Sequence, residues 1–185
     1  MVKPEKLEIF SSTNFVLQVP SSSGTGYLRV LTPSDVSGAY VQGMNDPEVT
    51  MWLDGVKNNV QTYEVIVEYV LQNLNDACSV LLGFYLNETL RGTVRLHELD
   101  RKERSVTIGI ALFDRTLWGL GFGCRLIEAV SAAGFETGLI DRIYAGIDER
   151  NLASQRTFEK AGFTATELNA YDYKYGRALK FKKEI

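Results

Sequence analysis

Residues Thr116–Val130 read TLWGLGFGCRLIEAV, three spaced glycines followed by an apolar pattern of helical period. Gly119, Gly121 and Gly123 stand where the helix has to begin, although glycine loses more backbone entropy on folding than any other residue. Either the chain makes a tight turn here, or a ligand approaches the bare backbone. A helix N-terminus attracts phosphate, because its free N–H groups and the helix dipole both favour negative charge. The rest of the sequence has to distinguish these two explanations.

The spacing of these glycines argues against the two common nucleotide-binding loops. A dinucleotide-binding loop has the pattern G-x-G-x-x-G and an acidic residue at the end of the next strand. Here single residues separate the glycines, and Asp141 precedes the next predicted strand. A Walker A loop needs a lysine that this stretch lacks. Neither NAD nor ATP is therefore indicated as the ligand.

The composition is that of an ordinary globular domain. The chain has 185 residues, enough for one domain with a large core, and its net charge of -3 does not attract nucleic acid. Two separated cysteines, Cys78 and Cys124, and a single histidine, His97, do not form a metal-binding pattern. No segment looks like a signal peptide or a membrane span. We therefore expect a cytoplasmic protein with no metal ion, no nucleic-acid partner and no membrane anchor.

Alternating apolar residues and turn residues predict the strands of the fold. They are expected at 27–31, 78–86, 90–99, 105–113 and 142–148, followed by a final hairpin of 164–171 and 178–184. The three strands in the middle should form an antiparallel meander. A crossover from Ser105 to Asp148 should supply the one parallel pair.

Apolar residues at helical spacing predict the helices. They are expected from Pro33 to about Met44, from Pro47 to Leu53, from Thr62 onward, from Gly121 to Thr137, and from Asn151 to Gly162. Together with the strands they indicate an α+β fold with a central mixed, twisted sheet and flanking helices. Residues 1–26 read as an N-terminal extension and residues 27–185 as the single domain.

Two further blocks of sequence match one family together with the glycine loop. Trp118–Gly123 fits the pattern Q/R-x-x-G-x-G/A with tryptophan in first place, and Asn151–Phe163 reads N-x-x-S-x-x-x-F-E-K-x-G-F. Near the start stand LRVLTPSDV and NDPEV. From Tyr27 to the C-terminus the chain thus resembles the GNAT superfamily of N-acetyltransferases, in the branch of ribosomal-protein and amino-sugar enzymes. The resemblance implies a GNAT-like domain and an acyltransferase that moves an acetyl group from acetyl-CoA to a primary amine.

The resemblance also implies where acetyl-CoA binds. In this family the pyrophosphate lies on the N–H groups of the glycine loop, and side chains at Gly121 and Gly123 would block them. The pantetheine arm completes the gap where one strand splays from its parallel neighbour. Asn151 would hydrogen-bond that arm, although an asparagine there also suits a helix N-cap. The cofactor-binding residues implied are Ile110, Ala111, Leu112, Trp118, Gly119, Leu120, Gly121, Phe122, Gly123, Cys124, Asn151, Ser154 and Phe158.

The catalytic groups are less clearly marked. The reaction needs a route for the amine proton, stabilisation of the oxyanion and a proton for the leaving thiolate. Many members of the family use a tyrosine as the acid, but Phe158 occupies that position here. Ser154, one turn earlier, is the acid that the resemblance implies, with a small surface residue as the alternative. Asp148 is the first candidate for the base because it ends the splayed strand. His97 is expected to be structural.

The acceptor site is expected among the N-terminal helices and the last hairpin. Asn45, Trp52, Tyr171 and Tyr173 are candidates, because aromatic faces and a few polar groups suit a sugar or nucleotide. Trp52 in the core and Asn45 capping a turn are the structural alternatives. The resemblance favours a small-molecule amine, such as a nucleotide-linked amino sugar, with a protein N-terminus as the main rival. A non-catalytic CoA-binding module and a homodimer are further options.

Overall fold

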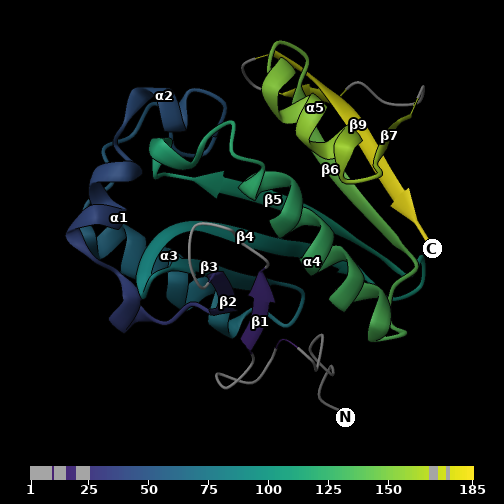
Figure 1. Cartoon of the computed structure of the whole chain (residues 1–185), viewed down its shortest axis with the longest axis horizontal. Coiled ribbons are helices and arrows are strands. Elements are labelled where there is room, and N and C mark those ends of the chain that lie inside the picture. The colour runs from purple at the N-terminus through teal and green to yellow at the C-terminus, as the bar shows by residue number, and fades with distance from the viewer. Residues whose placement is uncertain (1–9, 11–15, 20–25, 167–170, 174–175) are drawn as a thin grey trace.

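The predicted strands pair side by side in one mixed sheet (Figure 1). The computed structural model describes residues 10, 16–19, 26–166, 171–173 and 176–185, without the side chains of 171–173 and 176–178. Its strands are β1 (Val16–Val19), β2 (Gly26–Val30), β3 (Val80–Leu86), β4 (Thr89–Asp100), β5 (Ser105–Leu112), β6 (Arg142–Asp148), β7 (Thr164–Ala165), β8 (Tyr171–Tyr173) and β9 (Gly176–Glu184).

The strand order confirms the predicted α+β fold. It runs β1-β2-β3-β4-β5-β6-β9-β7, and β8 also pairs with β9. β3, β4 and β5 form the antiparallel meander, and β5 and β6 run parallel. Every other strand pair in the described residues is antiparallel. The crossover between β5 and β6 carries the glycine loop and its helix.

The helices cover both faces of the sheet. They are η2 (Pro33–Asp35), α1 (Gly38–Gly43), α2 (Pro47–Thr50), α3 (Tyr63–Asn75), η3 (Arg115–Leu117), α4 (Phe122–Glu136) and α5 (Leu152–Lys160). β3 is buried along its whole length, and its side chains pack into two hydrophobic cores, one on each face of the sheet. Leu82 and Phe84 pack into the core that includes α4, whereas Leu81 and Tyr85 pack into the core that includes α1 and α3. Figure 1 accordingly shows α4 on the opposite side of the sheet from α3.

The parallel pair of strands separates soon after it starts. Only Ser105–Thr107 pair with Arg142–Tyr144. Beyond that point β5 stays bonded to β4, and β6 to β9. The last four residues of β5 are half-buried, unlike the buried pair with which the strand begins. The splayed pair that the family resemblance implied is therefore present, and it opens toward the glycine loop.

The predicted helix from Pro33 to Met44 is wrong in one respect, because it is two helices. After η2, Val36 takes an extended conformation with ψ of 117°. Ser37 is also extended, and its hydroxyl caps α1 by accepting from the Tyr40 N–H at 3.3 Å. A serine that bonds the backbone two or three residues ahead competes with helix continuation. The first helix therefore ends at Asp35, and a second helix begins at Gly38.

The two ends of the chain add strands to the sheet. β1 pairs antiparallel with β2, so part of the predicted N-terminal extension belongs to the sheet. Phe10 is 1% exposed and lies in the core that includes α4. At the other end, the predicted strand 164–171 is divided between β7 and β8, both of which pair with β9. The stretch PSSSGTG from Pro20 to Gly26 has the composition of a linker, and residues 20–25 of it lie outside the described part.

Two glycines at the ends of α1 give a matched test of how this helix is seated. A Cβ on Gly43 would lie 2.5 Å from the Phe113 Cβ just after β5, whereas a Cβ on Gly38 would meet nothing within 4 Å. We expect Gly43→Ala to lower the free energy of unfolding by about 1–3 kcal/mol through overpacking. Gly38→Ala should raise it by about 0.5 kcal/mol through helix propensity. Urea unfolding measures both, and equal effects would contradict the close seating of α1.

Candidate active site

The glycine loop presents bare backbone at the start of α4. Gly119 and Gly121 have φ of 75° and 79°, in the left-handed region that suits glycine. Gly121 is the N-cap of α4 and supplies no side-chain cap. The first backbone hydrogen bond of the helix runs from the Arg125 N–H to the Gly121 carbonyl, at 3.2 Å. The N–H groups of the first turn therefore have no partner within the helix and are placed to bind an anion.

Gly123, the third glycine of the loop, is needed for a different reason, which is the packing of α4 against α5. A Cβ on Gly123 would lie 3.1 Å from Thr157 Cγ2, so α4 and α5 pack tightly here. Trp118 ties the loop to the end of β5, because its Nε1–H donates to the Leu112 carbonyl at 2.9 Å. Arg125 closes the loop from the helix side, where its Nη2 donates to the Leu120 carbonyl at 2.9 Å. The structure accounts for the tight turn raised by the sequence, and the approach of a ligand to the bare backbone stays a prediction.

The sequence block Asn151–Phe163 contains α5, which begins just after β6 ends, where β6 has separated from β5. Asn151 caps α5 by accepting from the Ser154 N–H at 3.1 Å, which is the capping role considered from the sequence. Ser154 is half-buried in the first turn. Phe158 is 2% exposed, and its ring meets that of Phe163 edge-on at 5.1 Å. Phe158 is thus a core residue, and its contact with a ligand stays a prediction.

Asp148 ends β6 in a tight ion pair. Arg150 donates to its carboxylate from the backbone N–H, from Nε at 2.9 Å and from Nη2 at 2.7 Å. Hydrogen bonds from Arg150 lower the pKa of Asp148, against the opposing effect of burial. A base works best with a pKa near the working pH, so this carboxylate is a weak one at neutral pH. The Arg150 guanidinium also lies 5.5 Å from the ring centroid of Trp52.

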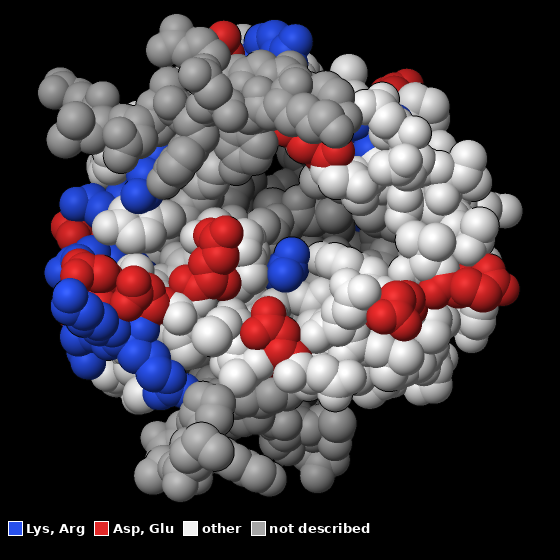
Figure 2. Space-filling view, turned by 180° about the vertical axis from the view of Figure 1, so that it is seen from behind, with Lys and Arg blue, Asp and Glu red and all other residues white. Residues whose placement is uncertain are grey.

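A large cavity lies on the α3 side of the sheet, beside the splay. Its volume is about 970 Å³. β5 forms one wall with Gly109, Ile110 and Ala111, two of which are predicted cofactor residues. Figure 2 shows the face seen from behind, hollowed near its centre, with acidic side chains on several sides of one basic patch. The other walls come from Tyr40, Met44, Leu53, Gly55, Val56, Asn59, Val60, Gln61, Glu64, Val65, Ile66, Glu68, Tyr69, Gln72, Thr93, Arg95 and His97.

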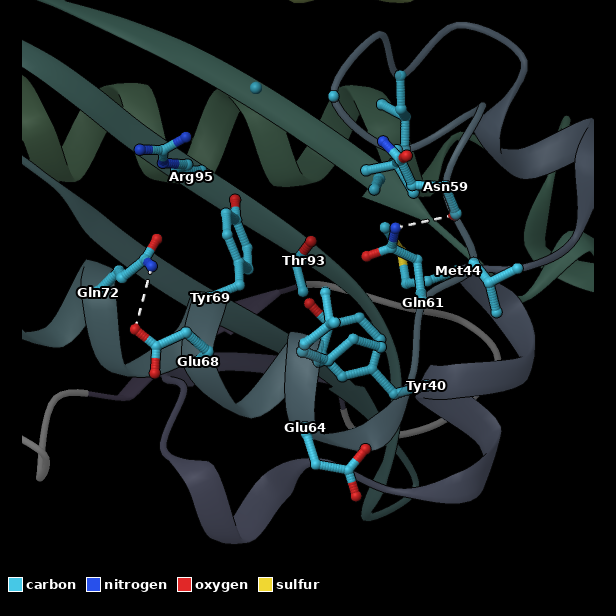
Figure 3. Close-up of a pocket in the computed structure, with 18 of the residues that line it drawn as sticks. Tyr40, Met44, Asn59, Gln61, Glu64, Glu68, Tyr69, Gln72, Thr93 and Arg95 are labelled. Carbon is cyan, nitrogen blue, oxygen red and sulfur yellow. Dashed lines mark hydrogen bonds between the residues drawn. The ribbon is translucent and has the colours of Figure 1, made fainter.

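Several polar groups of this cavity were missed by sequence reasoning. Thr93, Arg95 and His97 alternate along β4 and all line it, opposite Ala111, Gly109 and Thr107 of β5. Their alternation along the strand was the signal in the sequence that could have identified them as one face. Figure 3 shows Tyr69 beside Arg95 and Thr93, whereas Glu64 points away from them. Glu68 accepts a hydrogen bond from Gln72 Nε2 at 3.1 Å.

Asn45 and Trp52, two of the predicted acceptor residues, do not line the cavity. Asn45 is used structurally: Nδ2 donates to the Val41 and Gln61 carbonyls at 2.8 and 2.7 Å, and Oδ1 accepts from the Gln61 N–H at 2.9 Å. Trp52 is half-buried under Arg150. Tyr171 and Tyr173 lie on β8, and their side chains are outside the described part. A contact of these four residues with an acceptor stays a prediction.

Two further titratable groups have altered pKa values. Burial and the charge of Arg95 lower the pKa of His97, so the imidazole is neutral at neutral pH. Burial and the nearby Glu128 raise the pKa of the Cys124 thiol, which disfavours the reactive thiolate although the residue stands at a helix N-terminus. Cys124 therefore fits a small residue of the first helical turn better than a catalytic nucleophile.

Comparison with known families identifies the fold and the loop together. The model of the acetyltransferase (GNAT) domain matches residues 27–164, three quarters of the chain. The chain belongs to the GNAT acetyltransferase family. It is accordingly an acetyl-CoA-dependent acyltransferase, and the glycine loop, the splayed strands and α5 are the parts of a GNAT domain.

Individual relatives agree with this family. The chain is 29% identical over 154 residues to the uncharacterised N-acetyltransferase YoaA of Bacillus subtilis, covering 80% of this chain and 85% of YoaA. The structure of RimL, a ribosomal L7/L12 alpha-N-protein acetyltransferase with coenzyme A, matches with a TM-score of 0.79 at 19% identity, over 91% and 98% of the two chains. An aminoglycoside acetyltransferase, AAC(6')-Ib with coenzyme A and kanamycin, gives 0.70 at 19% identity, over 85% and 93%.

The residues present fit the coenzyme of a GNAT enzyme. The left-handed Gly121 leaves the first turn of α4 uncapped, as a pyrophosphate needs. Among the strands that the structure describes, none pairs with the half-buried end of β5 on its β6 side, as an amide-bearing arm needs. Within the described part, no three His, Cys, Asp or Glu side chains gather as a metal site. None of the helices there combines the length and the apolar composition of a membrane span.

Proposed function

We propose that this GNAT enzyme acetylates the primary amine of a small polar molecule, such as a nucleotide-linked amino sugar, bound in the cavity beside β5. One observation carries the proposal. The cavity shares Gly109, Ile110 and Ala111 with the strand that the family resemblance assigns to the pantetheine arm. An amine held in the cavity would thus lie against the backbone that positions the acetyl group.

The size and lining of the cavity support a small molecule. Its volume of about 970 Å³ is at the upper end of the range for small-ligand pockets, roughly 300–1,000 Å³. Tyr40 and Tyr69 offer aromatic surface, and Asn59, Gln72 and Thr93 offer hydrogen-bonding groups. Aromatic rings with a few polar groups suit sugars and nucleotides.

In this proposal the chain's own residues divide the reaction among them. Acetyl-CoA supplies the acetyl thioester. The N–H groups of the first turn of α4 hold its pyrophosphate, and a backbone N–H of Ile110–Leu112 polarises the thioester carbonyl. Ser154 gives a proton to the departing thiolate and recovers one from the acetylated nitrogen, so the proton that the amine loses ends on the thiol. Asp148, held ionised by Arg150, orients the end of β6 and is at most a weak base for the amine proton.

The direct test measures thiol release from acetyl-CoA with three acceptor pools. They are nucleotide-linked amino sugars, short peptides with free N-termini, and polyamines, and the mass of the product confirms the transfer. We expect release with the amino-sugar pool. Release with peptides alone would favour the protein N-terminus as acceptor, the rival activity to which the RimL likeness draws attention. Release with polyamines alone would contradict both.

A further inference from the structure

Arg95 is a half-buried cation in the wall of the cavity. It has no carboxylate at ion-pair distance among the residues that the structure describes. Two other half-buried arginines do have one: Arg29 pairs with Asp35, and Arg91 pairs with Asp114 at 2.7 Å. A half-buried charge without a counter-charge is costly unless something else neutralises it. Its position in the cavity indicates that a ligand supplies the missing charge.

A buried polar network holds this guanidinium in place. Arg95 Nε donates to Ser79 Oγ at 3.2 Å, and the Ser79 hydroxyl donates to Asn73 Oδ1 at 2.6 Å. Ser79 and Asn73 are only 2% and 4% exposed. Asn73 is fixed in turn by donating from Nδ2 to the Tyr69 carbonyl at 2.8 Å. The Arg95 guanidinium also lies 5.6 Å from the ring centroid of Tyr69.

This support is unusual for an arginine that only fills space. Asn73 lies in the last turn of α3 and Ser79 lies just before β3, so two separate parts of the chain orient one side chain of β4. A guanidinium fixed through Nε presents its two terminal nitrogens as a planar fork. Such a fork matches a carboxylate or a phosphate with two parallel hydrogen bonds.

We propose that Arg95 binds an anionic group of the acceptor, a phosphate or a carboxylate, so that the substrate is an amine that also carries negative charge. This inference rests on the proposed function of the cavity. Arg95 lies opposite Gly109, and Thr93 lies opposite Ala111, two residues further along. Two residues of a strand span about 7 Å. The anion and the reacting amine of the acceptor should therefore be separated by about 7 Å.

The carboxylates near Arg95 do not pair with its guanidinium in the described residues. Glu68 is exposed on α3 and is engaged by Gln72. Glu64 points away from Arg95 in Figure 3. Glu98 lies beyond His97, 3.7 Å from its Nδ1. None of these carboxylates forms an ion pair with Arg95 in the described residues, so the guanidinium stays available to a ligand.

Calorimetry on the full-length protein saturated with coenzyme A tests the inference. The probes are two matched pairs: glucosamine 6-phosphate against glucosamine, and 5-aminopentanoate against pentylamine. The first pair reports on phosphate and the second on carboxylate. We expect at least one anionic amine to bind about ten-fold or more tightly than its neutral partner, as a charge-assisted fork should give. Equal affinity within both pairs would overturn the inference.

Variants connect that preference to Arg95. Arg95→Gln should abolish the preference for the anionic amine and leave affinity for acetyl-CoA within about two-fold, because the loop lies elsewhere. Arg156→Gln, on the exposed side of α5, should change neither. Arg95→Lys keeps the charge without the fork and should retain part of the preference, which covers the case that Arg95→Gln folds poorly. A preference that survives in both Arg95 variants would overturn the inference.

Ser79 is a positioning residue in this scheme, and its test separates positioning from stability. Ser79→Ala should raise KM for the anionic amine several-fold while kcat, and KM for the neutral amine, stay nearly unchanged. Equal changes with both amines would reduce Ser79 to a structural role and overturn its part in anion binding. Failure of the proposed function would look different, since the amino-sugar pool would then give no thiol release from acetyl-CoA, whatever the peptides or polyamines give.

Discussion

Replacing Gly121 with alanine should weaken acetyl-CoA binding by about ten-fold to one hundred-fold. Gly121 is the N-cap of α4 and has φ of 79°. A methyl group there stands over the N–H groups of the first turn, and relief of the strained φ tilts those groups away from the pyrophosphate. Loss of one charge-assisted hydrogen bond costs about 1.5–3 kcal/mol, which corresponds to that range of affinity. Calorimetric titration with acetyl-CoA measures it.

Gly138 supplies the matched control for this substitution. Its φ is 66°, and a Cβ there would meet nothing within 4 Å, at the far end of α4 from the loop. Both alanine variants therefore bear a similar backbone penalty of about 1–2 kcal/mol in the free energy of unfolding. Only Gly121→Ala should lose affinity. Equal affinity in the two variants would mean that the loop does not hold the pyrophosphate.

Removing the Ser154 hydroxyl should have the second large effect. We expect Ser154→Ala to lower kcat by about ten-fold to one hundred-fold, with acetyl-CoA affinity nearly unchanged. General acids typically contribute about 100-fold or more, and a thiolate that leaves easily needs less help. Ser154 is half-buried in the first turn of α5, where its backbone N–H is already engaged by Asn151. Steady-state kinetics with the best acceptor from the thiol-release assay provide the measurement.

Thr157 offers a control on the same helix. Its hydroxyl donates to the Ala153 carbonyl at 2.8 Å, so it is already used, and its methyl group faces Gly123. Thr157→Val removes the hydroxyl and keeps the shape, and kcat should stay within about two-fold. If Ser154→Ala behaves like Thr157→Val, the leaving thiolate takes its proton from water or from another residue.

The parts of the site that could be predicted are local in sequence. The glycine loop, the start of α4 and the cap of α5 each depend on a few neighbouring residues, so Gly121 and Asn151 were identified correctly as the ends of helices. The antiparallel meander of β3, β4 and β5 and the parallel pair of β5 and β6 were predicted from the order of the elements along the chain. The break in the first predicted helix at Val36 was missed, because the sequence did not show that Ser37 caps a second helix instead of continuing the first.

The acceptor cavity could not be predicted in the same way. It is assembled from α3, β4 and β5, whose residues meet only after the sheet has formed. Arg95 was not singled out in the sequence, and its contact with Ser79 links positions 16 residues apart. Asn45 was chosen for its polarity, but its side chain holds residue 61 in place. Long-range packing decides which polar side chains face a ligand.

The three-residue pairing between β5 and β6 divides the sheet mechanically into two leaves. One leaf is β1 to β5, the other is β6 to β9, and in Figure 1 the second leaf with α5 stands apart from the first beyond that short seam. The amides of the pantetheine arm, bound in this opening, would join the two leaves along the rest of their length. The coenzyme would then be the missing central strand of the sheet, and the protein should be stiffest when it is loaded.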